Sequence, residues 1–288
     1  MKYLLYTFLL VFPFIGYAQS YKIYSTGLQK QVTLDDIVNN MAKADVLFYG
    51  EEHNDSVGHT LELALWQRIS EKYKDKAVLS LEMFETDTQP ILNEYLNGLI
   101  REKNFITEAR TWPNYKDYRP LIELAKEKHL PVIAANSPAR YTNRVTRLGL
   151  NSLQQLDSFG KSWLPPLPID TATGAYYQKF TDLMGGHGGM GGMQIYQSQN
   201  LWDAAMGWSI ARYLKAHPGS KILQINGSFH SEDKLGAAAQ IKKYAAAARI
   251  LNITAYAIND FEQVDWSKYS KSNDYIIVTD ARLIKDDQ

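Results

Sequence analysis

Six short apolar runs, separated by amphipathic stretches, constrain the fold of this chain more than any other feature of its sequence. The runs are residues 45–50, 77–83, 131–136, 221–227, 253–258 and 275–279. They are apolar and β-branched along almost their whole length, as is typical of strands that are buried on both faces. Between the first two runs an apolar residue recurs every four positions from Val57 to Tyr73, which predicts a helix with one buried stripe. Alternating strands and helices predict an α/β fold with a doubly wound, mostly parallel sheet.

Further helices are expected before the later strands, at residues 119–129, 200–217 and 236–249. Two intervals, 86–118 and 138–200, are longer than a connection between strands requires. We expect these intervals to form an inserted helical lid subdomain on a single domain that spans residues 19–288.

The first 18 residues predict that the protein is exported. They carry one lysine, an apolar run and then the small residues Gly16 and Ala18, which is the layout of a secretory signal peptide. A membrane anchor is the alternative, but the run is short and contains Pro13. The chain has no cysteine, which excludes disulfides, thiolate metal sites and lipidation of an N-terminal cysteine. We therefore expect a periplasmic or secreted protein, and the balance of 31 basic and 31 acidic residues gives no indication of nucleic acid as a partner.

Polar side chains follow four of the predicted strands at their carboxyl ends. They are Glu51, Glu52 and His53 after the first strand, Glu82 in the second, Asn136 in the third and His230 after the fourth. Ligands of open parallel sheets bind beyond this edge, so these side chains predict a shared crevice. Glu51 and His53 would point the same way from an extended backbone, whereas Glu52 is expected in solvent near the start of the next helix. A carboxylate at Glu82, inside an apolar strand end, requires a partner.

Two further polar residues have alternative interpretations. His59 lies roughly opposite the apolar stripe of its helix, so it faces either the solvent or the crevice. Asp203, on a later helix, would either orient a histidine of the crevice or pair with a base on the surface. One of Asn54, Asp55 and Ser56 is expected to cap the helix that follows the first strand.

Residues 184–193, MGGHGGMGGM, form an unusual tract with six glycines. His187 and Met190 in this tract carry ligand atoms that suit haem iron or copper. Phenols also ligate ferric haem, and the two long intervals supply them at Tyr118, Tyr176, Tyr177 and Tyr196. The alternative is a glycine-rich lid loop that binds nothing.

Several short motifs occur in an order that resembles one family. They are GEEH, LEMF, WPNYKDYRP, PVIAANSP, QNLWDAAM and INGSFH, spread over roughly residues 30–260. Together they resemble the ChaN-type haem-binding uptake proteins, within the Tiki/TraB-like and erythromycin-esterase-like superfamily. Two features depart from the family pattern: family members are often lipoproteins, whereas this chain has no cysteine, and the glycine-rich tract is not part of that pattern.

The resemblance implies an exported α/β protein with a small helical subdomain that binds haem in a pocket or in a homodimer. It also implies a place in iron acquisition, with an outer-membrane uptake system as a partner, and contacts to haem from tyrosine and histidine. Glu51, His53, Glu82 and His230 match the signature positions of the superfamily.

Two functions therefore follow from the sequence. The first is binding of haem or another iron-porphyrin for uptake. The second is a metal-dependent hydrolase of protease or esterase type, in which Glu51 or Glu82 is the general base and His53 and His230 bind a divalent metal or share the proton transfer. The chain contains neither an HExxH helix nor a serine elbow, so whether it has enzymatic activity stays open.

Overall fold

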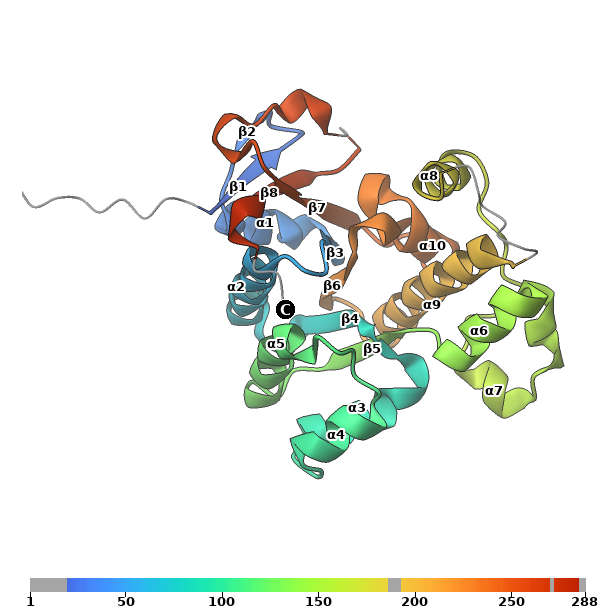
Figure 1. Ribbon diagram of the computed structural model, residues 1–288. Coiled ribbons are helices and arrows are strands. Elements are labelled where there is room, and N and C mark those ends of the chain that lie inside the picture. Colours follow the sequence, from blue (N-terminus) through green and yellow to red (C-terminus); the bar gives the residue numbers. More distant parts are fainter. Residues whose placement is uncertain (1–19, 186–192, 270–271, 285–288) are drawn as a thin grey trace, which may run out of the picture.

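A single eight-stranded sheet runs through the centre of the protein (Figure 1). The structure is a computed structural model, which describes residues 20–185, 193–269 and 272–284. Six strands of the sheet are parallel to one another: β3 (Val46–Glu51), β4 (Ala77–Glu85), β5 (Val132–Asn136), β6 (Lys221–Gly227), β7 (Ile250–Ile258) and β8 (Tyr275–Asp280). They coincide with the six apolar runs, so the prediction of a mostly parallel sheet is confirmed.

Two short strands at one edge of the sheet do not follow from the sequence pattern. β1 (Tyr21–Ser25) pairs with β8 in antiparallel orientation, and β2 (Lys30–Gln31) pairs with β1. β1 alternates partly buried and buried residues and β2 has two exposed residues, so neither forms a continuous apolar run.

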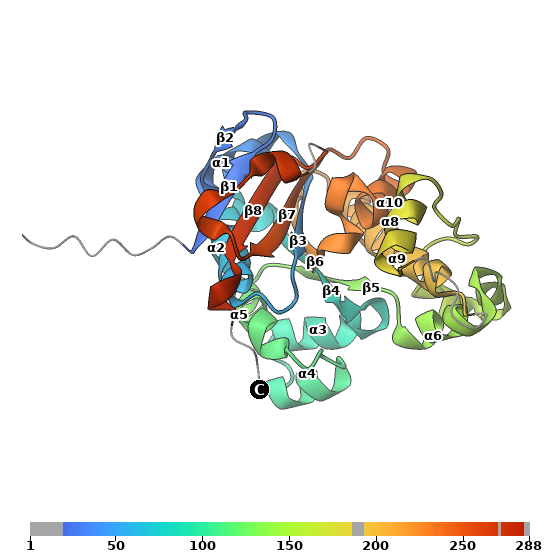
Figure 2. The same cartoon turned by 45° about the horizontal axis from the view of Figure 1, so that its top comes forward.

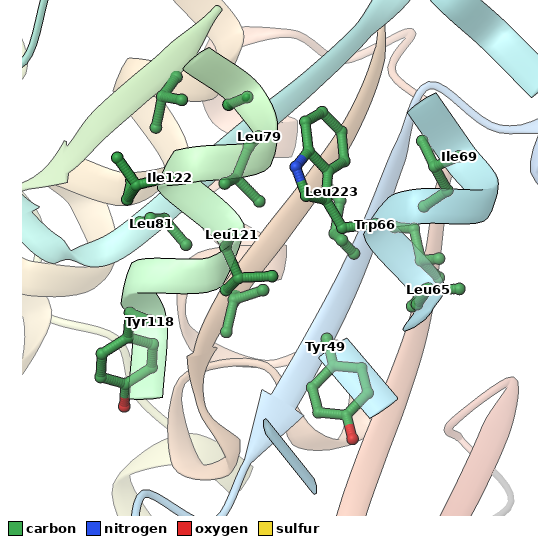
Figure 3. Close-up of a cluster of buried hydrophobic side chains, with 14 of the residues drawn as sticks. Tyr49, Leu65, Trp66, Ile69, Leu79, Leu81, Tyr118, Leu121, Ile122 and Leu223 are labelled. Atoms are coloured by element: carbon green, nitrogen blue, oxygen red, sulfur yellow. The ribbon is translucent and has the colours of Figure 1, made fainter. Parts of the chain in front are cut away.

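Helices cover both faces of the sheet, as expected of a doubly wound fold. One face is covered by α1 (Leu34–Asn40), α2 (Ser56–Tyr73), α3 (Gln89–Leu96) and α5 (Tyr115–Glu127). Trp66 of α2 and Leu121 of α5 belong to one buried cluster with Leu79 and Leu223 of the sheet (Figure 3). The other face is covered by α9 (Ile195–Ala216) and α10 (Gly236–Tyr244), whose apolar side chains contact β3, β4 and β6.

The two long intervals are helical. The interval 86–118 contains α3, α4 (Glu102–Glu108) and the start of α5, and 138–200 contains α6 (Ala139–Leu148), α7 (Ser158–Ser162), α8 (Ala175–Leu183) and the start of α9. In both views α6 lies next to α9 (Figures 1 and 2), and Tyr176 of α8 contacts Asp203 and Tyr196 of α9. Among the described helices, none combines the length and the apolar character needed to cross a bilayer.

The order of the strands determines which strand ends meet. From one edge to the other the order is β2-β1-β8-β7-β3-β6-β4-β5, so β6 lies between β3 and β4. Glu51, the last residue of β3, is in register with Gly227, the last residue of β6. A Cβ atom on Gly227 would lie 2.8 Å from the imidazole Nε2 of His53, so this glycine lets the His53 ring lie against the end of β6.

Candidate functional site

The carboxyl ends of β3, β4 and β6 bring together two buried polar clusters. The crevice cluster consists of Glu82, Asp203, His230 and Tyr176. The inner cluster consists of Glu51, His59, Glu62 and Tyr118.

The crevice cluster is a chain of hydrogen-bonded and ionic contacts. The backbone N–H of Gly227 donates to Glu82 Oε2 at 2.8 Å, and His230 Nε2 lies 3.4 Å from Glu82 Oε1. On its other side the same imidazole donates from Nδ1 to Asp203 Oδ1 at 2.7 Å. The phenol of Tyr176 donates to Asp203 Oδ2 at 2.5 Å. His230 is therefore held between two carboxylates, one of which is positioned by a tyrosine.

The charges in the crevice cluster compensate one another. Burial lowers the pKa of His230, but the neighbouring Glu82 and Asp203 raise it more, to about 10. Burial raises the pKa of Glu82, but His230 lowers it more, so that this carboxyl titrates below its usual range. Burial raises the pKa of Asp203 above its usual value, more than His230 and Tyr176 lower it, and the charge of Glu82 raises it slightly further. At neutral pH the imidazolium of His230 is thus a counter-charge inside the fold.

The inner cluster is centred on Glu51. The phenol of Tyr118 donates to Glu51 Oε1 at 2.7 Å, and His53 Nδ1 contacts the same oxygen at 2.7 Å. His59 Nδ1 lies 3.5 Å from Glu51 Oε2 and 3.1 Å from Glu62 Oε2. Burial raises the pKa of Glu62 well above its usual value and Glu51 raises it further. Burial also raises the pKa of Glu51, but His53 and Glu62 lower it more, to a value below the usual range.

His53 lies between the two clusters and is the most accessible of these groups. Its side chain is 47% exposed, and its ring lies edge-on to Trp112 with the centroids 5.3 Å apart. The hydrogen bond to Glu51 raises the pKa of His53 above its usual value.

A cavity of about 410 Å³ opens at this edge of the sheet. Its walls contain Glu82 and Asn136 from the strand ends, Trp112, Trp202 and several residues of α6. Both long intervals thus contribute to the cavity. A carboxylate next to a buried imidazolium at a cavity wall can accept or deliver a proton, and it can hold a cation.

The structure brings most of the predicted crevice residues together. Glu51, His53, His59, Glu82, Asp203 and His230 all belong to the two clusters or to the contact between them, and Asn136 lines the cavity. His59 is 8% exposed and faces the inner cluster, and Asp203 contacts His230, which resolves the alternatives left open for both residues. Asp55 is the N-cap of α2 and accepts from the backbone N–H of Val57. Glu52 is partly buried, so the expectation that it lies in solvent is wrong.

The predicted haem-contacting tyrosines are in four different environments. Tyr118 is 1% exposed and belongs to the inner cluster rather than to a lid, because α5 packs against α2. Tyr176 is buried in the crevice cluster, and the phenol of Tyr196, 8% exposed, donates to the carbonyl of Ala172. Tyr177, the next residue of α8, is 52% exposed. The predicted ligands His187 and Met190 lie outside the described residues.

Two members of the site are not among the predicted site residues. Glu62 completes the inner cluster, and the signal that could have indicated it is its position three residues after His59, on the same helical face. Gln199 Nε2 lies 3.1 Å from the phenol oxygen of Tyr176 and 3.1 Å from His230 Nδ1.

The described residues also contain one group of three side chains whose ligand atoms could share a metal ion, namely Glu51, His59 and Glu62. This group of three contains neither His230 nor His53. Metal binding by His53 and His230 stays a prediction.

Comparison with solved structures identifies relatives of this fold. ChaN of Campylobacter jejuni, in a structure titled for its cofacial haem binding, is 16% identical, with 90% of this chain and 96% of that chain covered and a TM-score of 0.66. The type III effector HopBA1 is 12% identical with a TM-score of 0.49, over 86% of this chain and 93% of that chain. The erythromycin esterase EreC is 10% identical with a TM-score of 0.47, over 82% of this chain and 77% of that chain. The first of these supports the α/β fold, and no match is found among the curated proteins.

A family model described as "Haem-binding uptake, Tiki superfamily, ChaN" matches residues 37–241. The match covers both polar clusters, the cavity and both helical intervals. The chain therefore belongs to the ChaN family of haem-binding uptake proteins in the Tiki superfamily.

Proposed function

We propose that this protein is exported and binds haem for haem or iron uptake, with the haem held on the surface of α8. The family supports a role of the haem-binding uptake type. The observation that carries the proposed location is the exposed side chain of Tyr177, whose ring packs edge-on against Tyr196.

The α8 surface exposes large side chains. We define the α8 surface by Tyr177 and Leu183 of α8, which are 52% and 68% exposed. Exposed large apolar side chains can mark a binding surface, and the flat faces of haem are apolar. The ring of Tyr177 rests edge-on against Tyr196, with the centroids 5.1 Å apart, which fixes its position on the helix.

Tyr177 is also the tyrosine best placed to ligate iron among the four predicted ones. The phenol oxygens of Tyr118, Tyr176 and Tyr196 form hydrogen bonds inside the fold. Within the described part of the chain, no hydrogen bond engages the phenol oxygen of Tyr177. A phenolate is an axial ligand of ferric haem, so when haem binds we expect Tyr177 to supply that ligand.

A haem bound at an exposed surface leaves one face of the porphyrin open. The Campylobacter jejuni relative is described as binding haem cofacially. A second copy of this chain, with its own α8 surface, would cover that open face. We therefore propose that haem promotes formation of a homodimer.

A haemin titration of the purified mature protein tests the proposed function. We expect a saturable shift of the Soret band and a change in its position and intensity for Tyr177→Phe. Tyr213→Phe is the matched control, because Tyr213 lies on α9 about 25 Å along the helix from Tyr196. Absence of a Soret shift for the wild-type protein at stoichiometric concentration would refute haem binding, and an unchanged spectrum for Tyr177→Phe would refute the assignment of the ligand.

Two further measurements address export and assembly. Mass spectrometry of the protein recovered from the periplasm or the medium should show a mature chain that begins at Gln19. Light scattering should show twice the monomer mass only when haemin is present. A full-length chain retained in the cytoplasm would contradict the first expectation, and an unchanged mass would contradict the second.

A further inference from the structure

Three potential ligand atoms converge inside the inner cluster, away from the α8 surface. They belong to Glu51, His59 and Glu62 and all lie within 4.8 Å of one another. The residues are 2%, 8% and 0% exposed. Glu51 comes from the end of β3, whereas His59 and Glu62 come from the first two turns of α2, so the group joins two elements of the fold.

The orientation of His59 turns its unprotonated nitrogen, Nδ1, toward the carboxyl oxygens of the group. Its Nε2 lies 3.1 Å from the backbone carbonyl oxygen of His53, and a carbonyl oxygen can only accept, so Nε2 carries a proton. In the neutral imidazole the lone pair of Nδ1 then faces Glu62 Oε2 at 3.1 Å and Glu51 Oε2 at 3.5 Å. Histidines that bind metals commonly donate their other ring N–H to a backbone carbonyl in this way.

The basic partners of Glu51 and Glu62 among the described residues are the imidazoles of His53 and His59. Glu51 and Glu62 form no ion pair with a lysine or arginine of residues 20–185, 193–269 and 272–284. Glu51 Oε2 and Glu62 Oε1 also have no hydrogen-bond partner there, although both atoms are buried. Two buried carboxyl groups side by side need a shared proton or a cation, and a cation between them would engage both oxygens that have no hydrogen-bond partner.

We propose that Glu51, His59 and Glu62 bind a divalent transition-metal cation. Ligand atoms bonded to Zn²⁺ at about 2.0–2.2 Å in tetrahedral geometry are about 3.3–3.6 Å apart, close to the two distances from His59 Nδ1. One imidazole and two carboxylates suit Zn²⁺ or Mn²⁺. The ion would link the end of β3 to α2 and fix the side chain of Glu51, which forms hydrogen bonds with His53 and Tyr118. The inference does not depend on haem binding.

Metal titration of the mature protein after dialysis against a chelator tests the proposal. Calorimetry with ZnCl₂ and with MnCl₂ should show one cation bound per chain, with a higher melting temperature in the bound state. Glu62→Gln keeps the shape of the side chain and should weaken binding by at least about 100-fold, since even residues that only support a ligand contribute 10- to 100-fold. Glu71→Gln, the same change at an exposed position of α2, should bind like the wild type.

Three outcomes would overturn the proposal. If the wild-type protein binds neither cation, a proton shared by Glu51 and Glu62 accounts for the group. If Glu62→Gln binds with wild-type affinity, the cation is bound elsewhere, for example by His53 and His230. Circular dichroism of the chelated variants shows whether they fold, and His59→Gln is a second variant at an independent ligand: unchanged affinity in that variant would also contradict the proposal.

Discussion

The crevice cluster and the inner cluster lie at the ends of neighbouring strands, but their charges are balanced differently. In the crevice cluster the imidazolium of His230 lies between Glu82 and Asp203, and Glu82 also accepts from a backbone N–H. In the inner cluster two carboxyl groups converge on one imidazole nitrogen, and Glu51 Oε2 and Glu62 Oε1 have no hydrogen-bond partner among the described residues. The comparison shows that the same residue types form a self-compensated network in one place and an incomplete ligand set in the other.

Replacing His230 should have the largest effect, because it leaves Glu82 and Asp203 buried without a counter-charge. We expect His230→Gln to lower the free energy of unfolding by about 3–5 kcal/mol, measured by urea denaturation at pH 7. His217→Gln, at an exposed position, should change it by less than about 0.5 kcal/mol. A loss below about 1 kcal/mol for His230→Gln would show that the crevice cluster is not an essential ion network.

The pH dependence of the free energy of unfolding should also identify His230 as the buried counter-charge. The pKa of His230 is raised from 6.5 to about 10 in the folded protein, so its contribution is complete below about pH 6.5 and is lost as the pH rises towards 10. The difference in unfolding free energy between the wild type and His230→Gln should therefore shrink on the order of 3–5 kcal/mol between pH 6 and pH 10. A difference that stays constant over this range would contradict the assignment of the charge to His230.

The change from glutamate to glutamine should destabilise the metal-free protein in the crevice cluster but not in the inner cluster. Glu82→Gln removes a partner of a buried imidazolium and should destabilise the fold by about 2–3 kcal/mol. The pKa of Glu62 is raised, so its ionised form opposes folding at pH 7, and Glu62→Gln should leave the stability unchanged or raise it by about 1 kcal/mol. Thermal and urea denaturation after chelation measure both variants. Equal destabilisation by the two changes would mean that the clusters do not differ as described.

The sequence predicted the sheet well, because continuous apolar runs and four-residue helical periodicity reflect burial directly. The rule that parallel strands present their carboxyl ends at one edge was sufficient to place Glu51, Glu82 and His230 in one region. It could not separate them into two clusters, because that division depends on β6 lying between β3 and β4, and strand order is not visible in a single sequence.

The errors concern contacts between elements that are distant in the sequence. Tyr118 was expected in a lid, but the packing of α5 on α2 brings its phenol to Glu51, 67 residues away. Glu62 appeared to be an ordinary polar residue of an amphipathic helix. Its role depends on the approach of Glu51 from β3, which the helical pattern alone does not show.

Hydrogen–deuterium exchange with and without haemin tests most directly the claim that haem is held by the α8 surface and leaves both polar clusters intact. The account predicts that haemin slows exchange in residues 175–183 and 195–199 and leaves the strand ends at residues 48–53, 80–85 and 224–230 unchanged. Slower exchange at those strand ends, with none in α8, would contradict it and place the haem in the crevice.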